Sequence, residues 1–266
     1  MVGNMSAGKS ALINALVGYK VSKSQNIACT SKIHTIIDEP KEKNALIYDE
    51  GNTKIQFRGC LAKSNISLID SPGVNSSLND EHRCITHNAI KAGMYDLMLV
   101  VLNASQLGIV DDDNLLDFIQ EHAANKPKLF IINKVDVINP EEENINQIIE
   151  NSRQYLVEKK FTNPIVCPVS AKAALKYYDI KDNGVGNISN RERRSYDFMC
   201  ELMTKLKIGY YYKHKDKKLF DRVEKSRKKL ERLLLNSGIN YVAEYIKNNA
   251  SSISDYRNIG LNIATK

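Results

Sequence analysis

The sequence contains few cysteines, and they form no recognisable pattern. Its five cysteines are scattered along 266 residues, with no C-x-x-C pair and no cluster with histidine. Neither a disulfide framework nor a zinc site is therefore indicated. A reducing cytoplasm is the compartment that this pattern favours, with peripheral contact at the inner face of a membrane as a further expectation. The cysteines are Cys29, Cys60, Cys84, Cys167 and Cys200.

Long hydrophobic runs, repeats and low-complexity segments are also missing. The longest apolar run, from Leu97 to Leu102, has the length of a strand and is far below the roughly 20 residues that span a bilayer. No signal peptide is expected before the first motif. A hydrophobic content of 42% is typical of a globular core, so the composition argues against a disordered chain.

Basic residues exceed acidic ones, and the excess lies late in the chain. The formal net charge is +7, with basic residues gathered in KLKIGYYYKHKDKKLF and DRVEKSRKKLERLLL. Such segments can bind anionic lipid or nucleic acid, and they can equally form the solvated face of a helix. Both interpretations stay open from the sequence.

Short β-rich runs alternate with helical stretches over the first two thirds of the chain. This alternation predicts βαβ units and an α/β fold with a doubly wound, mostly parallel sheet. Residues 45–57 are expected to form a hairpin that turns at 50–52. The runs are 33–38, 45–50, 53–59, 66–70, 97–103, 128–133 and 164–170.

From about Asn190 the strands stop and helical patterns take over. We therefore divide the chain into an α/β domain, 1–190, and a helical segment, 191–266. The helical segment either completes the domain or begins a truncated helical stalk. An apolar stripe through Leu230, Leu233 and Leu234 ends at Ser237-Gly238.

GNMSAGKS, near the start of the chain, fits the phosphate-loop pattern G-x-x-x-x-G-K-[ST] at every fixed position. The glycines let backbone N–H groups converge on the β-phosphate, Lys9 neutralises β and γ oxygens, and the Ser10 hydroxyl ligates Mg²⁺. SALINALVG supplies the helix that such a loop must open. The expected nucleotide-binding residues of the loop are Gly3, Asn4, Met5, Ser6, Ala7, Gly8, Lys9 and Ser10.

ISLIDSPGV carries a second phosphate-side element. The strand is expected to end at Asp70, which can hold Mg²⁺ through water, and the Gly73 N–H can reach the γ-phosphate. A catalytic threonine must then lie between the loop and this strand, with its hydroxyl on Mg²⁺ and its carbonyl on the attacking water. Thr30 is the first choice for this role and Thr35 is the competitor.

KLFIINKVD and PIVCPVSAK place two base-reading segments at strand ends. The Asp136 carboxylate can accept hydrogen bonds from the N1–H and the exocyclic amine of guanine, a donor pair that adenine lacks, so GTP is favoured over ATP. Lys134 can lay its stem across the base, and Asn133 can tie this segment to the phosphate loop. In the second segment, Ser170, Ala171 and Lys172, the Ala171 N–H can meet guanine O6.

GNMSAGKSALINALVG together with LIDSPGVNSS, NASQLG and NKVD resembles the bacterial branch of the dynamin-like GTPases, from Gly3 to about Lys172. NSGINYVAEYI is similar to the end of that family's GTPase domain, and Thr30 follows Lys9 at about the family's spacing for the switch threonine. The resemblance implies a doubly wound domain of the P-loop GTPase type that hydrolyses GTP and dimerises across the nucleotide face. It also implies a companion dynamin-like chain as a further partner, and coupling to membrane remodelling.

The resemblance also bears on catalysis. Val74 stands where small Ras-like GTPases place a water-orienting glutamine, so that mechanism is excluded. Dynamin-like enzymes instead use a monovalent cation, K⁺ or Na⁺, held in part by the fourth residue of the loop, here Ser6. Animal members place a glutamine just before this serine, where this chain has Met5, whose backbone alone can contribute.

Only Met1 and Val2 precede the loop, where a buried central strand is expected. We therefore expect the first strand to be missing and the chain to be a fragment, a misassigned start or part of a split gene. Unpaired groups on the neighbouring strands would each cost roughly 1–3 kcal/mol. Two alternatives to the dynamin-like assignment remain: an RNA- or ribosome-associated GTPase, and a non-hydrolysing remnant that only binds nucleotide or a partner.

Overall fold

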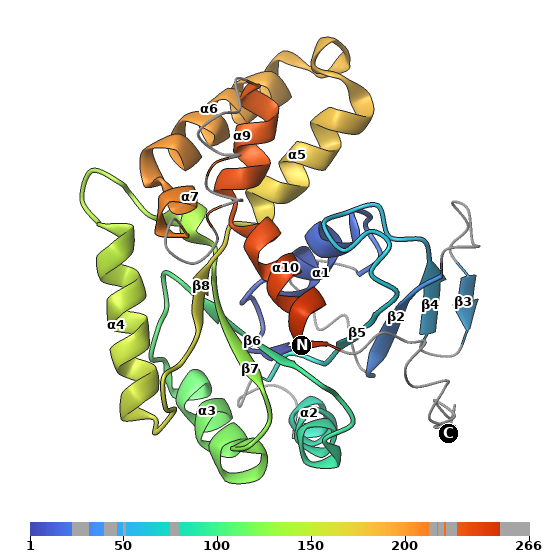
Figure 1. Ribbon diagram of the computed structural model, residues 1–266, viewed down its shortest axis with the longest axis vertical. Helices are drawn as coiled ribbons and strands as arrows, with labels where there is room; N and C mark the ends of the chain where they lie inside the picture. Colours follow the sequence, from blue (N-terminus) through green and yellow to red (C-terminus); the bar gives the residue numbers. More distant parts are fainter. Residues whose placement is uncertain are drawn as a thin grey trace.

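A computed structural model of the chain describes residues 1–22, 32–39, 47–49, 52–74, 80–212, 217, 221 and 228–250. Its centre is a parallel sheet of four strands in the order β1-β6-β7-β8. These strands are β1 (Val2–Gly3), β6 (Met98–Asn103), β7 (Lys128–Asn133) and β8 (Val166–Pro168). Figure 1 shows this sheet passing through the middle of the molecule.

A second set of strands lies beside β1. Its order is β3-β4-β2-β5, with β2 antiparallel to β5 and β3 antiparallel to β4. The chain continues from β5 along β1, because Asn4 and Val74 form a parallel bridge and the Ser71 N–H donates to the Met1 carbonyl at 3.3 Å. The strands are β2 (His34–Asp38), β3 (Ile47–Asp49), β4 (Asn52–Ile55) and β5 (Ser67–Asp70).

The segment before the phosphate loop does form a strand, although a short one. Val2 pairs with Val100 and Gly3 with Val101, so β1 occupies the central position between β6 and the chain after β5. The sequence pattern had indicated no strand there. The loop is therefore anchored on both sides, by β1 before it and by helix α1 (Lys9–Val17) after it.

Successive residues of the central strands alternate between two apolar cores, one on each face of the sheet. Leu99 and Val101 of β6 pack on one face, while Val100 and Leu102 pack on the other. All of β6 is buried, as expected for a parallel strand with helices on both sides. This packing explains why the run reads as continuously apolar rather than alternating.

Helices cover both faces of the sheet (Figure 1). One face carries α1, α5 (Ala171–Asn183) and α10 (Ile239–Asn249). The other carries α2 (Asp80–Ala92), α3 (Val110–Ala123) and α4 (Ile145–Glu158). Short 3-10 turns, η1 (Val135–Val137) and η2 (Val185–Asn187), follow β7 and α5. The predicted doubly wound α/β fold is confirmed.

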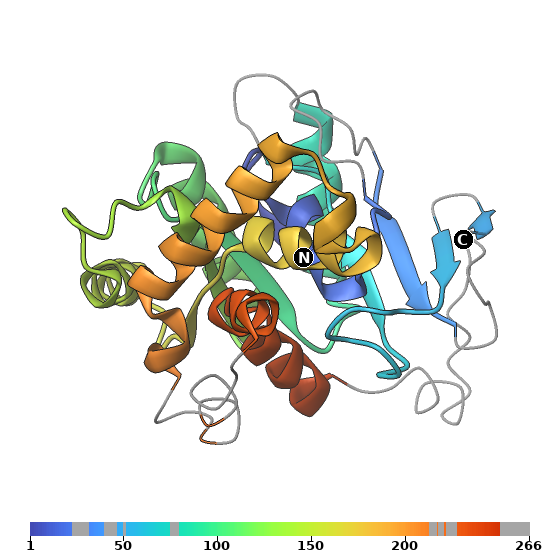
Figure 2. The same ribbon diagram turned by 90° about the horizontal axis from the view of Figure 1, so that it is seen from above.

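The helices after residue 189 pack against this body. They are α6 (Asn190–Leu206), α7 (Ile208–Tyr211) and α9 (Lys229–Asn236). A capping box between Ser189 and Glu192 starts α6. Figures 1 and 2 both show α6 and α9 beside α5, and Met203 and Leu233 are buried in the core of the α2–α4 face.

Most expected elements appear close to their expected bounds. β7 spans the residues anticipated for it, and the β3–β4 hairpin forms, with Asn52 pairing inside β4 and residues 50–51 outside the described part. Helix α5 was not anticipated, although Ser170 before it is a favourable cap residue. Among the described residues, no helix combines the length and apolar character needed to cross a membrane.

Candidate nucleotide-binding site

The phosphate loop and the other motifs meet at one edge of the sheet. β1, β6, β7 and β8 are parallel, so their carboxyl ends share that edge, and the chain after β5 runs beside β1. Ligands of doubly wound sheets bind at this edge. The structure therefore brings together the loop after β1, Asp70 at the end of β5, Asn133 at the end of β7 and Ser170 after β8.

Two left-handed backbone conformations shape the loop. Ser6 has φ 67° and is exposed, while Gly8 has φ 90° and precedes the first residue of α1. A Cβ atom on Gly8 would lie 2.3 Å from Nδ2 of Asn133, and one on Gly3 would lie 2.4 Å from the Val101 carbonyl oxygen. Both glycines are thus required because other parts of the chain approach the loop closely.

The Asn133 side chain joins the loop to both base-reading segments. Its Nδ2 donates to the carbonyls of Ala7 at 3.0 Å and Gly8 at 3.4 Å, and its Oδ1 accepts the Ala171 N–H at 3.1 Å. The expected tie to the phosphate loop is present. The Ala171 N–H, expected to meet guanine O6, is instead donated to Asn133 in the structure.

Asp136 is held in place from the second base-reading segment. The Ser170 hydroxyl donates to one carboxylate oxygen at 2.6 Å, and Lys172 lies 3.7 Å from the other. The side chain of Asp136 is only 3% exposed, whereas that of Lys172 is 72% exposed. Lys134 adopts a left-handed conformation, with φ 65°, directly before η1. The four residues thus form one rigid patch at the sheet edge.

Lys9 and Asp70 form a buried pair of opposite charges on the phosphate side. The Lys9 ammonium donates to the carbonyls of Gly3 at 2.8 Å and Asn4 at 3.0 Å. Burial lowers the pKa of Lys9 to about 8 and raises the pKa of Asp70, and the attraction between the two opposes both shifts. A negative charge added near Lys9, or a positive charge added near Asp70, would therefore be stabilised.

One buried oxygen of Asp70 fits the role expected of a Mg²⁺ partner. Asp70 is 1% exposed, its Oδ2 accepts the Ser22 hydroxyl at 3.1 Å, and its Oδ1 has no hydrogen-bond partner among the described residues. An ionised, unpaired carboxylate oxygen is a ligand that Mg²⁺ or its water accepts readily. Ser10 lies in the first turn of α1, so the donor set of this chain fits the ion.

Two residues that sequence reasoning missed support this carboxylate. Asn14 of α1 accepts the backbone N–H groups of Val21 at 2.9 Å and Ser22 at 2.8 Å, and its own Nδ2 donates to the Ser22 carbonyl. This arrangement fixes the turn from which Ser22 reaches Asp70. An asparagine on the otherwise apolar face of a helix, 3% exposed, was the available signal.

Gly73 and Thr30 are further residues that were expected to act in catalysis. Gly73 lies against the phosphate loop, because a Cβ there would be 2.9 Å from the Met5 Cα atom. The Val74 N–H donates to the Gly3 carbonyl at 3.4 Å. Thr30 lies outside the described residues. Its competitor Thr35 lies within β2, paired with Ile69.

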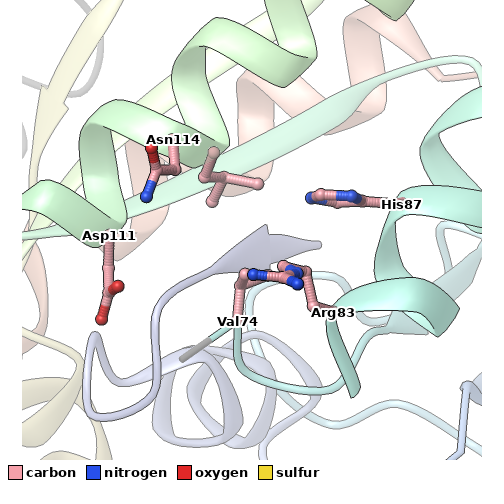
Figure 3. Close-up of a pocket in the computed structure, with 6 residues that line it drawn as sticks. Val74, Arg83, His87, Asp111 and Asn114 are labelled. Carbon is pink, nitrogen blue, oxygen red and sulfur yellow. The ribbon is translucent and has the colours of Figure 1, made fainter. Parts of the chain in front are cut away.

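A cavity of about 250 Å³ opens between α2 and α3 beside Val74. Figure 3 shows Arg83 and His87 reaching from α2 towards α3, which contributes Asp111 and Asn114. The His87 ring stacks on Phe118 at 3.6 Å, and burial together with nearby cations lowers the pKa of His87. The cavity therefore borders the segment that follows Asp70.

Comparison with known proteins gives matches to GTPases. A family model described as "50S ribosome-binding GTPase" matches residues 1–134. A "Probable transmembrane GTPase FZO-like, chloroplastic" from Arabidopsis thaliana is 28% identical over 183 residues, which are 66% of this chain and 19% of that protein. A "GTPase Era" from Fusobacterium nucleatum is 30% identical over 156 residues, 56% of this chain and 45% of that protein.

The chain thus spans less than half the length of these two relatives. Among solved structures, one titled as an oligomerised bacterial dynamin pair has a TM-score of 0.49 and 17% identity, covering 93% of this chain and 47% of that one. Toc33 from Arabidopsis thaliana, in a dimerization-deficient form, has a TM-score of 0.45 and 14% identity, covering 64% and 68%. These TM-scores are too low to support a closer relationship.

Proposed function

Because the chain belongs to the GTPase family described as "50S ribosome-binding GTPase", we propose that it binds GTP with Mg²⁺ at the phosphate-loop edge and hydrolyses it to GDP and phosphate. The observation that carries this proposal is the Asn133 side chain, which couples the phosphate loop to both base-reading segments. A site assembled in this way can bind the guanine base and the phosphates of one GTP molecule at the same time.

We assign each residue a role; all but Thr30, which lies outside the described residues, also have a described position at the sheet edge. Lys9 neutralises the β and γ oxygens, the loop N–H groups bind the β-phosphate, and the Gly73 N–H serves the γ-phosphate. Ser10, Thr30 and Asp70 hold Mg²⁺, which when bound screens the charge on the transferring phosphoryl group. Thr30 orients the attacking water. Asp136, Lys134 and the segment from Ser170 to Lys172 bind guanine.

Base specificity provides the sharpest test of this proposal. Asp136→Asn should weaken GTP binding at least tenfold, because it removes a charged acceptor from guanine. It should raise the affinity for xanthosine triphosphate, which needs a donor at that position. Calorimetry with GTP, ATP and xanthosine triphosphate measures both effects, with Asp182→Asn, an exposed aspartate of α5, as the matched control. ATP binding as tightly as GTP in the wild type would refute the assignment.

Hydrolysis is expected to depend on Lys9 and Thr30 in different ways. Lys9→Ala should abolish tight phosphate binding, whereas Thr30→Ala should leave binding largely intact and remove turnover. Val74→Gln should give little gain. A Thr30→Ala enzyme with the wild-type rate would transfer the role to another residue.

At a finer level, we infer a dynamin-like mode of action, with self-association across the nucleotide face, a monovalent cation at Ser6 and contact with membranes. The relative named as a probable transmembrane GTPase supports this inference, since it matches 66% of the chain. Phosphate release faster in K⁺ or Na⁺ than in choline, and rising with protein concentration, is the expected result. A rate independent of both would exclude this mode.

An RNA- or ribosome-associated GTPase is the second candidate, supported by the description of the family and by the relative named GTPase Era. Liposome flotation and RNA gel shifts, each at low and moderate salt, separate the two candidates. Flotation that survives moderate salt favours the dynamin-like mode, and an RNA shift favours the second. Nucleotide binding with neither turnover nor partner would favour a non-hydrolysing remnant.

A further inference from the structure

A side-chain pair outside the expected motifs connects the phosphate loop to α3. Asn4, the second residue of the loop, is 5% exposed, and Asp112, in the first turn of α3, is 2% exposed. The Asn4 amide nitrogen donates to Oδ1 of Asp112. In Figure 3 the start of α3, at Asp111, lies beside the segment that carries the loop.

Each partner of this pair keeps one unsatisfied oxygen. Asn4 Oδ1 and Asp112 Oδ2 are both buried, and neither has a hydrogen-bond partner among the described residues. Two acceptor oxygens cannot satisfy one another, and leaving both unpaired in the interior is costly. A single proton on Asp112 removes the problem, because the carboxyl O–H can then donate to the amide oxygen while the amide N–H donates to the carboxyl.

We propose that Asp112 is a positioning residue for the nucleotide site, held as a neutral acid whose proton closes a reciprocal pair of hydrogen bonds with Asn4 and fastens the phosphate loop to α3. Asn4 precedes Met5 and Ser6, so the pair sets the point at which the loop leaves β1. The part of this proposal that concerns nucleotide affinity rests on the proposed GTP binding.

The surroundings of Asp112 favour the neutral form. Burial, followed by the charges of Asp111 and Asp113, raises the pKa of Asp112 to about 7, and the hydrogen bond from Asn4 opposes the shift. In the described part of the chain, the titratable and charged groups near Asp112 are Arg83 and His87 of α2, which line the same cavity as Asp111, Tyr155 and Lys159 of α4, and Lys9 beside Asn4.

Lys159 and Lys9 are already engaged with other groups. Lys159 pairs with Asp113 at 3.0 Å, and Lys9 donates to the carbonyls of Gly3 and Asn4. Tyr155 donates to Asp113 at 2.8 Å. Asp113, one neighbour of Asp112 on its own helix, is thus paired with groups of α4, while Asp112 itself faces the loop.

The sign of the pH dependence follows from this shift. The pKa of an aspartate in an unfolded chain is about 3.8, whereas burial raises the pKa of the folded Asp112 to about 7. Between these values the folded state holds more protons, so its stability falls as pH rises through this window. The contribution of the pair is fully present below about pH 4 and is lost above about pH 7.

Bound nucleotide should, like folding, favour the protonated form of Asp112. Its phosphates are negatively charged and lie against the loop, so an ionised Asp112 weakens binding and bound nucleotide in turn favours the protonated acid. Loss of one hydrogen bond and the added repulsion together are expected to lower affinity roughly three- to tenfold.

The variant Asp112→Asn separates a positioning role from a merely structural one. Its amide can donate to Asn4 Oδ1 and accept from Asn4 Nδ2 at every pH, so the reciprocal pair persists without a titratable proton. The matched control is Asp117→Asn, which makes the same change on the same helix at a side chain that is 63% exposed. Titration of the nucleotide itself is common to all three proteins.

The first measurement is the affinity for a fluorescent GDP analogue from acidic to mildly alkaline pH. We expect the wild type and Asp117→Asn to lose affinity roughly three- to tenfold more than Asp112→Asn as pH rises through about 7. Identical pH profiles in all three proteins would overturn the proposal.

The second measurement needs no nucleotide. The infrared band of a protonated carboxyl should be present in the full chain at pH 6, titrate near pH 7, and persist in Asp117→Asn and in Asp70→Asn, whose own carboxyl is also buried. The component that titrates near pH 7 should be absent from Asp112→Asn, whether or not Asp70, whose pKa burial also raises, contributes a band of its own. If no guanine nucleotide binds, the proposed function fails while this band still decides the state of Asp112, and its absence from the wild type overturns the inference.

Discussion

At the scale of single residues, the Asn133 side chain links the phosphate loop to the two base-reading segments. It is 1% exposed and uses both ends of its amide, donating to the Ala7 and Gly8 carbonyls and accepting the Ala171 N–H. Gly8 must lack a side chain for this contact to form. The identity of one residue thus depends on the other, although they lie far apart in the sequence.

Replacing Asn133 by alanine should therefore destabilise the fold as well as weaken nucleotide binding. The variant leaves the buried Ala171 N–H and Ala7 carbonyl unpaired, and a loss of about 2–4 kcal/mol in the free energy of unfolding is expected. Urea denaturation measures it. Asn146→Ala, at an exposed position of α4, should change the stability by less than about 0.5 kcal/mol. Equal effects of the two variants would contradict this role for Asn133.

At the scale of elements, β2 is joined to its neighbours by the carboxylate at its end. Asp38 is 1% exposed, its Oδ1 accepts the Phe57 N–H at 2.9 Å, and its Oδ2 accepts the Asn65 N–H at 3.0 Å. These bonds hold the segments that flank β4 and β5. Because β5 ends at Asp70, the position of the Asp70 carboxylate depends on the bonds that hold this part of the sheet together.

The isosteric variant Asp38→Asn tests this connection. An amide has one acceptor oxygen, so one of the two backbone N–H groups would face an N–H₂ donor instead of an oxygen. A loss of about 1–3 kcal/mol is expected on chemical denaturation. The exposed replacement Asp182→Asn should remain within about 0.5 kcal/mol of the wild type. If Asp38→Asn changes the free energy of unfolding as little as Asp182→Asn does, the Asp38 carboxylate does not hold these segments together.

At the scale of the whole molecule, the helices after residue 189 share the core of the nucleotide domain. Met203 of α6 is fully buried with residues of β6 and β7, and Ile239 of α10 lies in the core of the opposite face. The Ser170 N–H donates to the Ser237 carbonyl at 2.9 Å, so the junction between α9 and α10 contacts the base-reading segment. We propose on these grounds that the described part of 191–266 completes the domain.

Two substitutions on one helix test that proposal. Met203→Ala, at a side chain with no exposure, should cost about 2–4 kcal/mol and shift a single unfolding transition. Phe198→Ala, at a position of the same helix that is 64% exposed, should cost less than about 0.5 kcal/mol. A Met203→Ala protein that unfolds in two separate steps, with the nucleotide site unaffected, would make α6 an independent unit.

The sequence by itself determined the order of most strands and helices and the motifs at the strand ends. Apolar runs such as 98–103 and 128–133 must be buried, and polar residues that follow them, such as Asp70 and Asn133, must then lie at the sheet edge. These inferences need only neighbouring residues, so they could be made without coordinates. The helix α5 was missed because its sequence has no strong apolar period.

Only the tertiary structure decided which distant groups share a proton or a hydrogen bond. Ser22 reaches Asp70, Ser170 reaches Asp136, and Asn4 reaches Asp112 across 108 positions of the chain. Burial sets the pKa of Asp112 and leaves its second oxygen unpaired, and burial is a property of packing rather than of local pattern. The two-residue β1 is likewise a strand because β6 and the chain after β5 pair with it from both sides.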